Sequence, residues 1–484
     1  MKSIYSILNV LRKGEIELIK HYYTRPVNAE NKMRLSLLET ALRKKGLANS
    51  EAILELREGM STSAFSHLKR RLKKDMLNAL LWQESEKRFP EAYLAGEFEC
   101  TKNISQAYVL LLRGNTKEGL KLLESARKLA QKFELVTHRI TINQLIRRRF
   151  DGIKNARGLK DVNIQLLSDI ENISRLNFAE ENTLLLATPQ LFPKGAGDVF
   201  RETGSDVLNE LKLRYTDSGL SRVGFWYYMA ATEFYRSNGM FEEMLDHGMG
   251  FFKLVNESDS LRSDPNVSGV SQTVGTAMVR LHRFKEAEEY LEISVQKFRE
   301  GGINQLASLE LLFKAQMATY GTFRSKETVD KGLLHRRTGM SERLGARWNY
   351  FKACREFLSS KPDQSYTTLN SNGDLMKWKD DLNVQFRILE VLQLIELEDY
   401  DWIDFKLDTL RKFVSRNRKL KSSRVDGIIK VLHAIQAKSY DLTKLNNSTL
   451  EVIKKLHSNE KGWGWNPLGF ELVRFDAWIE RKIG

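Results

Sequence analysis

Two consecutive stretches of this chain, Arg222–Leu254 and Val267–Phe298, carry the pattern that most restricts its fold. Each holds two helical segments with periodic apolar residues, joined by a short turn. In the second stretch Gly275 lies in the middle of the first helix, Arg283–Phe284 form the turn, and Ala287 lies where the returning helix comes closest. Small residues let antiparallel helices touch, so the pattern predicts helix–turn–helix units that bury their apolar faces by stacking.

Turn residues recur through the second half of the chain. They fall near Gly239, His282, Gly321, Lys361 and Glu398, about 40 residues apart. The units around Gly321 and Tyr400 keep mainly the apolar rhythm. The other units also place small and aromatic residues at matching positions: Tyr228, Ala231, Thr232 and Tyr235, then Gly275, Met278, Phe284, Ala287 and Leu291, then Tyr350, Ala353, Cys354, Phe357 and Tyr366.

This recurrence resembles the tetratricopeptide family, and the resemblance covers about half of the chain. Family units are usually ~34 residues long, so the longer spacing here implies longer helices. The resemblance implies a superhelix with a groove that binds a protein or peptide, and the chain's positive net charge favours acidic partners. In the family, ligand contacts come from exposed positions of the first helix of each pair, which here are Met229, Glu233, Arg236, Gln272, Thr276 and Val279. These residues lack the repeated Lys/Asn/Arg set that would clamp a peptide carboxylate.

The fold class expected for the whole chain is all-α, an α-solenoid of antiparallel helix pairs preceded by a basic helical module. Only 7 prolines occur in 484 residues, and runs typical of strands are scarce. We expect the basic module over residues 1–90, degenerate helical repeats over 91–190, a loop or hinge over 191–220, tetratricopeptide-like repeats over 221–460 and a C-terminal capping helix over 461–484. Within the degenerate repeats, helices are expected over Asn103–Arg113 and Thr116–Phe133, and Gly119 falls at the close-contact position of the family's second helix. The loop or hinge is expected from the Pro/Gly cluster Thr188–Gly197.

The N-terminal module concentrates positive charge. Residues 1–75 hold 16 Lys and Arg against 8 Asp and Glu, in a chain whose net charge is +15. The expected helices are Ser3–Tyr22, Ala29–Lys45, Glu51–Glu58 and Ser61–Gln83. Such charge favours polyanions such as nucleic acid, although charged runs are as often solvated helix faces.

Residues 52–72 of this module resemble a helix-turn-helix motif. Gly59 would allow the turn, Met60 would pack inward and Ser61 would cap a recognition helix. The opposing observation is that Glu51, Glu55 and Glu58 would repel a phosphate backbone. The possible nucleic-acid contacts are Ser61, Ser63, Ser66, His67, Lys69, Arg70, Arg71, Lys73 and Lys74.

A second basic run lies near the end of the chain. Its members are Arg411, Lys412, Arg416, Arg418, Lys419, Lys421 and Arg424. Further on, Gly462–Pro467 breaks the repeat pattern, and a final helix is expected over Phe470–Ile483. The aromatic residues of that helix would cover the open apolar end of the stack.

Nothing in the sequence indicates catalysis, and no cofactor or metal is expected. The histidines are scattered singly, and no phosphate-binding loop or nucleophile elbow is present. Cys100 and Cys354 are expected to be buried, reduced thiols. No apolar segment approaches the length of a membrane span, so a cytoplasmic location is expected. The sequence therefore favours a non-enzymatic scaffold or regulatory adaptor, with a DNA-binding transcriptional regulator reading DNA through Ser61–Lys74 as the alternative and an RNA- or ribosome-associated protein as a third reading.

Overall fold

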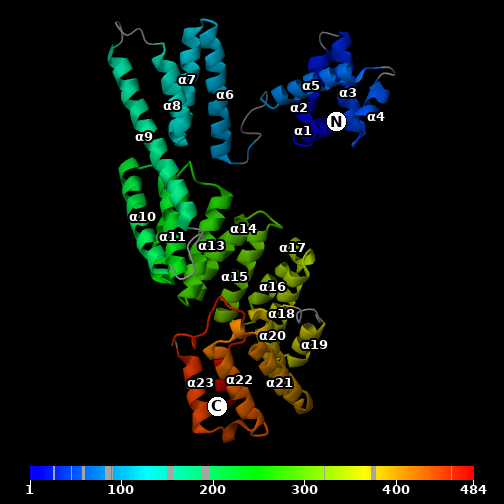
Figure 1. Ribbon diagram of the computed structural model, residues 1–484, viewed down its shortest axis with the longest axis vertical. Coiled ribbons are helices and arrows are strands. Elements are labelled where there is room, and N and C mark those ends of the chain that lie inside the picture. The colour runs from blue at the N-terminus through cyan, green and yellow to red at the C-terminus, as the bar shows by residue number, and fades with distance from the viewer. Residues whose placement is uncertain are drawn as a thin grey trace. The chain divides into compact units, whose positions relative to one another are not determined.

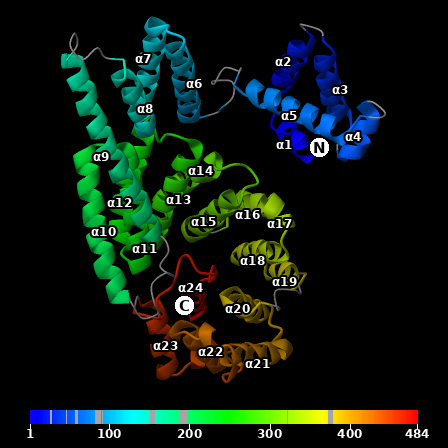
Figure 2. The same cartoon turned by 45° about the horizontal axis from the view of Figure 1, so that its top comes forward.

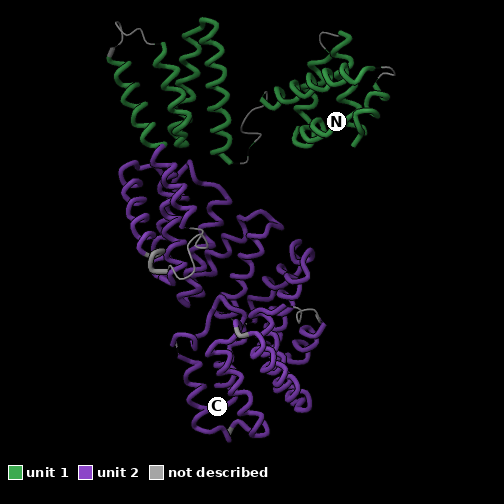
Figure 3. Tube along the Cα trace, viewed as in Figure 1, with its two compact units in different colours: residues 1–173 green, residues 174–484 purple. Residues whose placement is uncertain are grey.

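The computed structural model of the chain describes residues 1–24, 28–44, 46–56, 60–81, 89, 91–149, 156–186, 197–320, 322–371, 378–458 and 460–483. Within these ranges all regular secondary structure is helical, and strands are absent (Figure 1). The chain divides into two compact units, residues 1–173 and 174–484 (Figure 3). The sequence analysis predicted the helical class correctly.

The first helices of unit 1 enclose a core of their own. They are α1 (Lys2–Leu8), α2 (Lys13–Thr24), α3 (Ala29–Arg43), α4 (Asn49–Leu56) and α5 (Thr62–Ala79). Ile4, Leu38, Phe65 and Leu72 are among the buried residues of that core. The single helix expected over Ser3–Tyr22 was wrong.

The break between α1 and α2 has a local cause. The backbone N–H of Arg12 donates to the Glu15 carboxylate at 2.7 Å, which caps a new helix start. A periodic apolar pattern continues across such a break, so the pattern alone suggests one helix where the chain forms two.

Three further helices of unit 1 follow: α6 (Ala92–Leu112), α7 (Thr116–Lys132) and α8 (Val136–Arg147). α6 packs on α7 and begins well before the expected Asn103. Gly114 forms the turn between them with a φ of +84°, a left-handed conformation that favours glycine. A Cβ added to Gly119 would lie 2.8 Å from Leu111 Cγ, so this glycine marks a close helix contact, as the sequence predicted.

The expected loop over 191–220 needs correction. Residues 188–196, which hold most of the Pro/Gly cluster, lie outside the described residues. Most of the remainder is helix α10 (Gly197–Ser218), and before it comes the long helix α9 (Ala156–Leu186). The boundary between the two units falls inside α9, after Ile173, and not near residue 190. Loop-forming residues in one short stretch do not interrupt the helical pattern on either side of it.

The two best-patterned pairs of unit 2 form as expected. They are α11 (Ser221–Asn238) with α12 (Phe241–Glu257), and α13 (Asp264–Arg280) with α14 (Phe284–Lys297). Their turns pass through left-handed residues, Gly239 at a φ of +73° and His282 at +60°. A Cβ on Gly275 would lie 2.6 Å from Leu291 Cγ, so Gly275 is the point of closest approach in the second pair.

Unit 2 continues with further helices, and here too helices adjacent in sequence pack on each other. They are α15 (Ile303–Tyr320), α16 (Ser325–Leu334), the short α17 (Arg336–Gly339), α18 (Glu342–Leu358), α19 (Pro362–Asn370), α20 (Asp381–Glu396), α21 (Tyr400–Arg416), α22 (Ser423–Gln436) and α23 (Asn447–His457). Neighbours in sequence pack on each other, as α14 does on α15 and α20 on α21. The first helices of these pairs, α11, α13, α15, α18, α20 and α22, are called the first-helix row below.

The chain ends in an irregular stretch and one helix. Residues 460–474, here called the C-terminal segment, precede α24 (Phe475–Ile483). The final helix therefore begins later than the expected Phe470. Figure 2 shows the segment in orange-red, running past α15 before it reaches α24.

Candidate binding surfaces

The C-terminal segment lies along the first-helix row. Arg280 of α13 donates to the Asn466 side-chain oxygen at 2.7 Å. Lys314 of α15 donates to the carbonyl of Leu468 at 2.8 Å, and the hydroxyl of Tyr350 in α18 donates to the carbonyl of Phe470 at 2.7 Å. Two of these three bonds go to backbone carbonyls and one goes to a side chain, so the row fixes this irregular stretch through both kinds of atom.

Lys314 is the central contact of this stretch. Its side chain is 4 % exposed and also pairs with Glu310 at 2.9 Å. Its ammonium lies 5.0 Å from the Phe470 ring centroid, and the guanidinium of Arg347 lies 5.2 Å from the same ring. Burial lowers the pKa of Lys314, and the charge of Glu310 partly offsets that effect. Two cations thus hold one aromatic ring against α15 and α18.

Arg424 of α22 anchors the end of the segment. Its guanidinium pairs with Glu471 at 2.6 Å and with Asp476 at 2.8 Å, and it also donates to the carbonyls of Leu456 and Trp463. All three charged side chains are less than a tenth exposed. Since an unpaired buried charge is costly, each partner here depends on the others.

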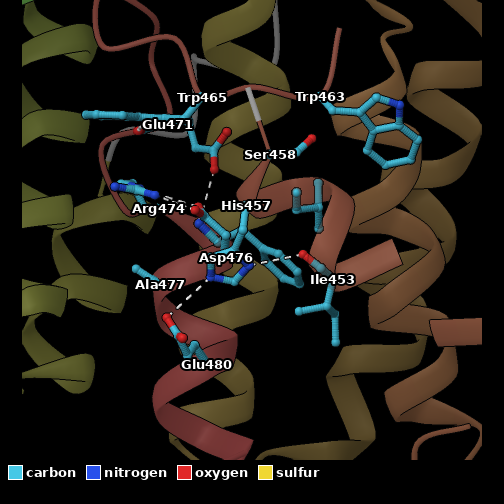
Figure 4. A network of polar contacts seen from close by, with 12 residues as sticks. Ile453, His457, Ser458, Trp463, Trp465, Glu471, Arg474, Asp476, Ala477 and Glu480 are labelled. Carbon is cyan, nitrogen blue, oxygen red and sulfur yellow. Dashed lines mark hydrogen bonds and ion pairs between the residues drawn. The ribbon is translucent and has the colours of Figure 1, made fainter. Parts of the chain in front are cut away.

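Figure 4 shows Glu471, Arg474 and Asp476 converging beside the helix that begins at Phe475. Arg474 donates to Asp476 from the solvent side. Burial alone would raise the pKa of Asp476, but the hydrogen bond from Arg474 and the charges of Arg424 and Arg474 outweigh it and lower that pKa. This carboxylate is therefore ionised in its buried position.

The aromatic residues near the C-terminus contact helices besides the last pair. α24 contacts α23, as a cap on the last pair would. However, Trp478 donates to Glu396 of α20 at 2.7 Å, and Phe470 lies 6.5 Å from Phe351 of α18, centroid to centroid. The sequence analysis expected these aromatic side chains only at the end of the helix pairs, whereas they also contact α18 and α20.

The predicted groove residues have mixed surroundings. Glu233 and Arg236 pair with each other on α11, with Arg236 Nε 3.0 Å from the carboxylate. Gln272 donates to Ser308 of α15 at 2.9 Å, and the Thr276 hydroxyl bonds within α13. Met229 is half-buried and packs against an apolar cluster.

Val279 was wrong as a groove contact, because it is fully buried in the core between α13 and its neighbours. Its position at the end of the i, i+4, i+7 run from Gln272 cannot distinguish an exposed stripe from one that turns toward the neighbouring helix.

The predicted basic run near residue 411 also needs correction. Arg424 is buried, so it offers no surface charge. Arg411 and Lys412 share the carboxylate of Asp408, at 2.7 and 2.6 Å. Lys421 lies 3.5 Å from Asp426, while Arg416 and Lys419 are exposed. The side chain of Arg418 is not among those that the structure describes. Four of the seven basic side chains of this run thus have carboxylate partners within the fold.

α5 begins where the sequence predicted. Ser61 caps it by accepting from the Ala64 backbone N–H at 3.2 Å. The buried face is Phe65, Leu68, Leu72, Met76 and Ala79. The opposite face exposes Ser63, Ser66, His67, Arg70, Lys73 and Lys74.

Two of the proposed phosphate contacts on α5 have intramolecular partners. Lys69 lies 3.4 Å from Asn49 Oδ1, and Arg71 pairs with Glu30. The expected repulsion from α4 is reduced, because Glu55 binds Lys44 and Arg43, and the hydrogen bond from Lys44 lowers the pKa of Glu55. Gly59 and Glu58 lie outside the described residues.

The two cysteines are free and buried, as predicted. Burial raises the pKa of Cys100 and of Cys354 to about 12, so neither thiol ionises near neutral pH. In the described ranges, no three His, Cys, Asp or Glu side chains gather as a metal site would require. None of the described helices combines the length and the apolar character that crossing a bilayer demands.

No protein-family model matches this chain, and no curated protein matches its sequence. The contacts of the C-terminal segment were missed by sequence reasoning, which treated Gly462–Pro467 only as an end of the pattern. The signal that was available is composition: two tryptophans and an Asn-Pro pair are unusual for a solvated linker.

Proposed function

We propose that this chain is a non-enzymatic adaptor whose tetratricopeptide-like helix pairs stack as an α-solenoid and bind another protein. The observation that carries the proposal is the first-helix row, which already holds an irregular polypeptide segment through Lys314, Tyr350 and Arg424. A surface that satisfies backbone carbonyls suits peptide ligands generally. The left-handed turn residues and the close contact at Gly275 support the family resemblance.

The partner would occupy the part of the row before the C-terminal segment. Along α11 and α13 the predicted groove residues Glu233, Arg236, Gln272 and Thr276 are exposed or half-buried. The first residue of the row to contact the segment by a hydrogen bond is Arg280, at the end of α13. Self-binding thus leaves α11 and most of α13 as the receptive surface.

The test is purification of the intact chain from its native cells, with the mass of the complex measured by light scattering. We expect one protein at fixed stoichiometry. The variant Glu233→Arg with Arg236→Glu exchanges the two charges but keeps their mutual pairing, so folding is preserved while complementarity is reversed. Loss of the partner in this variant supports the proposal. Recovery of the bare chain, or binding unchanged by the exchange, contradicts it.

A second candidate function is nucleic-acid binding through α5. The observation in its favour is that Lys73 and Lys74, within the described part of the chain, are exposed and pair with no carboxylate. Together with Arg70 they line one face of a capped helix. As a regulator, the protein would read duplex DNA with Ser63, Ser66 and His67 in the groove.

A salt titration of labelled duplex DNA and single-stranded RNA against the full chain tests this second candidate. The change Lys73→Ala with Lys74→Ala should reduce the slope of log affinity against log salt by about 2. The matched control removes Lys331 and Lys454, which already pair with Glu327 and Glu451. Similar affinity for RNA and DNA would favour the RNA or ribosome-associated reading, and no salt-sensitive binding would exclude both.

A further inference from the structure

A cleft opens on the second helices of the two best-formed pairs, and part of its lining comes from Met278 of α13. The residues that line it belong to α12, α14, the end of α13 and the turn between α13 and α14. Its apolar surface comes from Leu245, Met249, Met278, Leu281 and Tyr290. Met249 is 39 % exposed although it is a large apolar residue, so part of this surface faces solvent.

The polar residues of the cleft are predominantly acidic. Glu242, Asp246, Glu286 and Glu289 line it, with Arg283 as the cation among the lining residues. Arg283 is already bound to Glu286, with Nε 2.8 Å from one carboxylate oxygen. The other three carboxylates are exposed and form no ion pair with any described residue. The cleft therefore carries net negative charge on a chain of net charge +15.

The spacing of these carboxylates indicates the shape of a ligand. Glu242 and Asp246 are one helical turn apart on α12, and Met249 follows on the next turn. Cations on a ligand helix at i and i+4 have the same spacing, since residues one turn apart lie side by side on a helix surface. Methionine side chains adapt to varied apolar partners, as surfaces that bind amphipathic helices require.

We propose that this cleft binds a basic amphipathic helix of a partner protein. Lysine or arginine side chains of that helix pair with Glu242, Asp246 and Glu289, and an apolar side chain lies on Met249 and Tyr290. The inference deepens the proposed adaptor function by naming a class of partner. Glu233 and Arg236 do not line this cleft, so the charge exchange at those two residues tests the adaptor proposal separately from this one.

The test measures fluorescence anisotropy of a labelled helical peptide of leucine and lysine, titrated with the full chain. The control peptide replaces each lysine by glutamate. We expect the lysine peptide to bind and to weaken with added salt, and the glutamate peptide not to bind. Nonspecific attraction to a chain of net charge +15 would favour the glutamate peptide, so the expected preference is diagnostic.

Three neutral substitutions, Glu242→Gln, Asp246→Asn and Glu289→Gln, should together weaken the lysine peptide about ten-fold. The matched control neutralises Glu300, Glu398 and Asp401, which are exposed elsewhere in unit 2. Met249→Ala should weaken binding without changing charge. Equal binding of both peptides, or an equal effect of the two triple variants, overturns the proposal; circular dichroism confirms that each variant folds.

Discussion

The helix pair α13–α14 and the C-terminal segment belong to the same unit but are held by different forces. The pair meets through small and apolar residues, with Gly275 against Leu291. The segment is fixed by Arg424 and Lys314, whose partners are buried carboxylates and backbone carbonyls. Contacts of the first kind join residues close in sequence. Those of the second join residues as far apart as Lys314 and Leu468, and removing one member leaves another without compensation.

The largest effect should come from Arg424→Ala. Because Glu471 would stay buried without its cation and Asp476 would keep only Arg474, we expect unit 2 to lose about 3–5 kcal/mol of unfolding free energy. Urea denaturation followed by tryptophan fluorescence measures this. Arg416→Ala, an exposed arginine on α21, should change it by less than about 0.5 kcal/mol. A loss no greater than that of Arg416→Ala would show that the segment does not depend on the buried charges.

The same network predicts a pH dependence. The pKa of Asp476 is lowered in the fold, so its ionised form stabilises unit 2; that contribution is complete above the unfolded-state pKa of about 3.9 and is lost as pH falls through the folded-state value. The Tm should therefore decrease as the pH is lowered below about 4. Asp476→Asn should lower the Tm at neutral pH and flatten the acid decline. The control Asp401→Asn changes an exposed carboxylate, so its Tm should depend on pH as that of the parent chain does.

A moderate effect is expected at the helix pair. Gly275→Ala places a Cβ 2.6 Å from Leu291 Cγ, so α13 and α14 must shift apart. Overpacking of this kind costs about 1–3 kcal/mol, which the same denaturation experiment measures. If Gly275→Ala were neutral, the pair would not be closely packed at this point. Close packing would then not distinguish α13–α14 from the C-terminal segment.

The smallest effect, opposite in sign, is expected six residues earlier on the same helix. Gly269 lies in α13 with nothing within 4 Å of an added Cβ. Gly269→Ala should stabilise unit 2 by about 0.5–1 kcal/mol, because alanine loses less backbone entropy in a helix. The two glycine variants differ only in what the new methyl group meets, so opposite signs would assign the cost at Gly275 to packing.

Local features of the sequence predicted a good part of the fold. The pairs α11–α12 and α13–α14, the Ser61 cap and the contact at Gly119 were all predicted, because periodicity, capping and small-residue positions act within a few turns of helix. The break between α1 and α2 was missed, because one side chain, Glu15, restarts the helix within a continuous apolar pattern.

The surfaces were predicted less well. Val279 and Arg424 were taken as exposed, but both are buried. A residue at the edge of a helical stripe faces solvent or a neighbour depending on where the next helix lies. A basic residue in a charged run is buried when distant carboxylates arrive to pair with it, as Glu471 and Asp476 do.

By itself the sequence determined the helical class, the regular pairs of unit 2 and the start of α5, since these depend on interactions between neighbouring residues. Only the tertiary structure decided that residues 460–474 lie along the first-helix row and that four carboxylates of α12 and α14 share a cleft. Both arrangements bring together side chains from separate helices. No period or spacing along the chain encodes such a meeting, because it depends on how the helices pack.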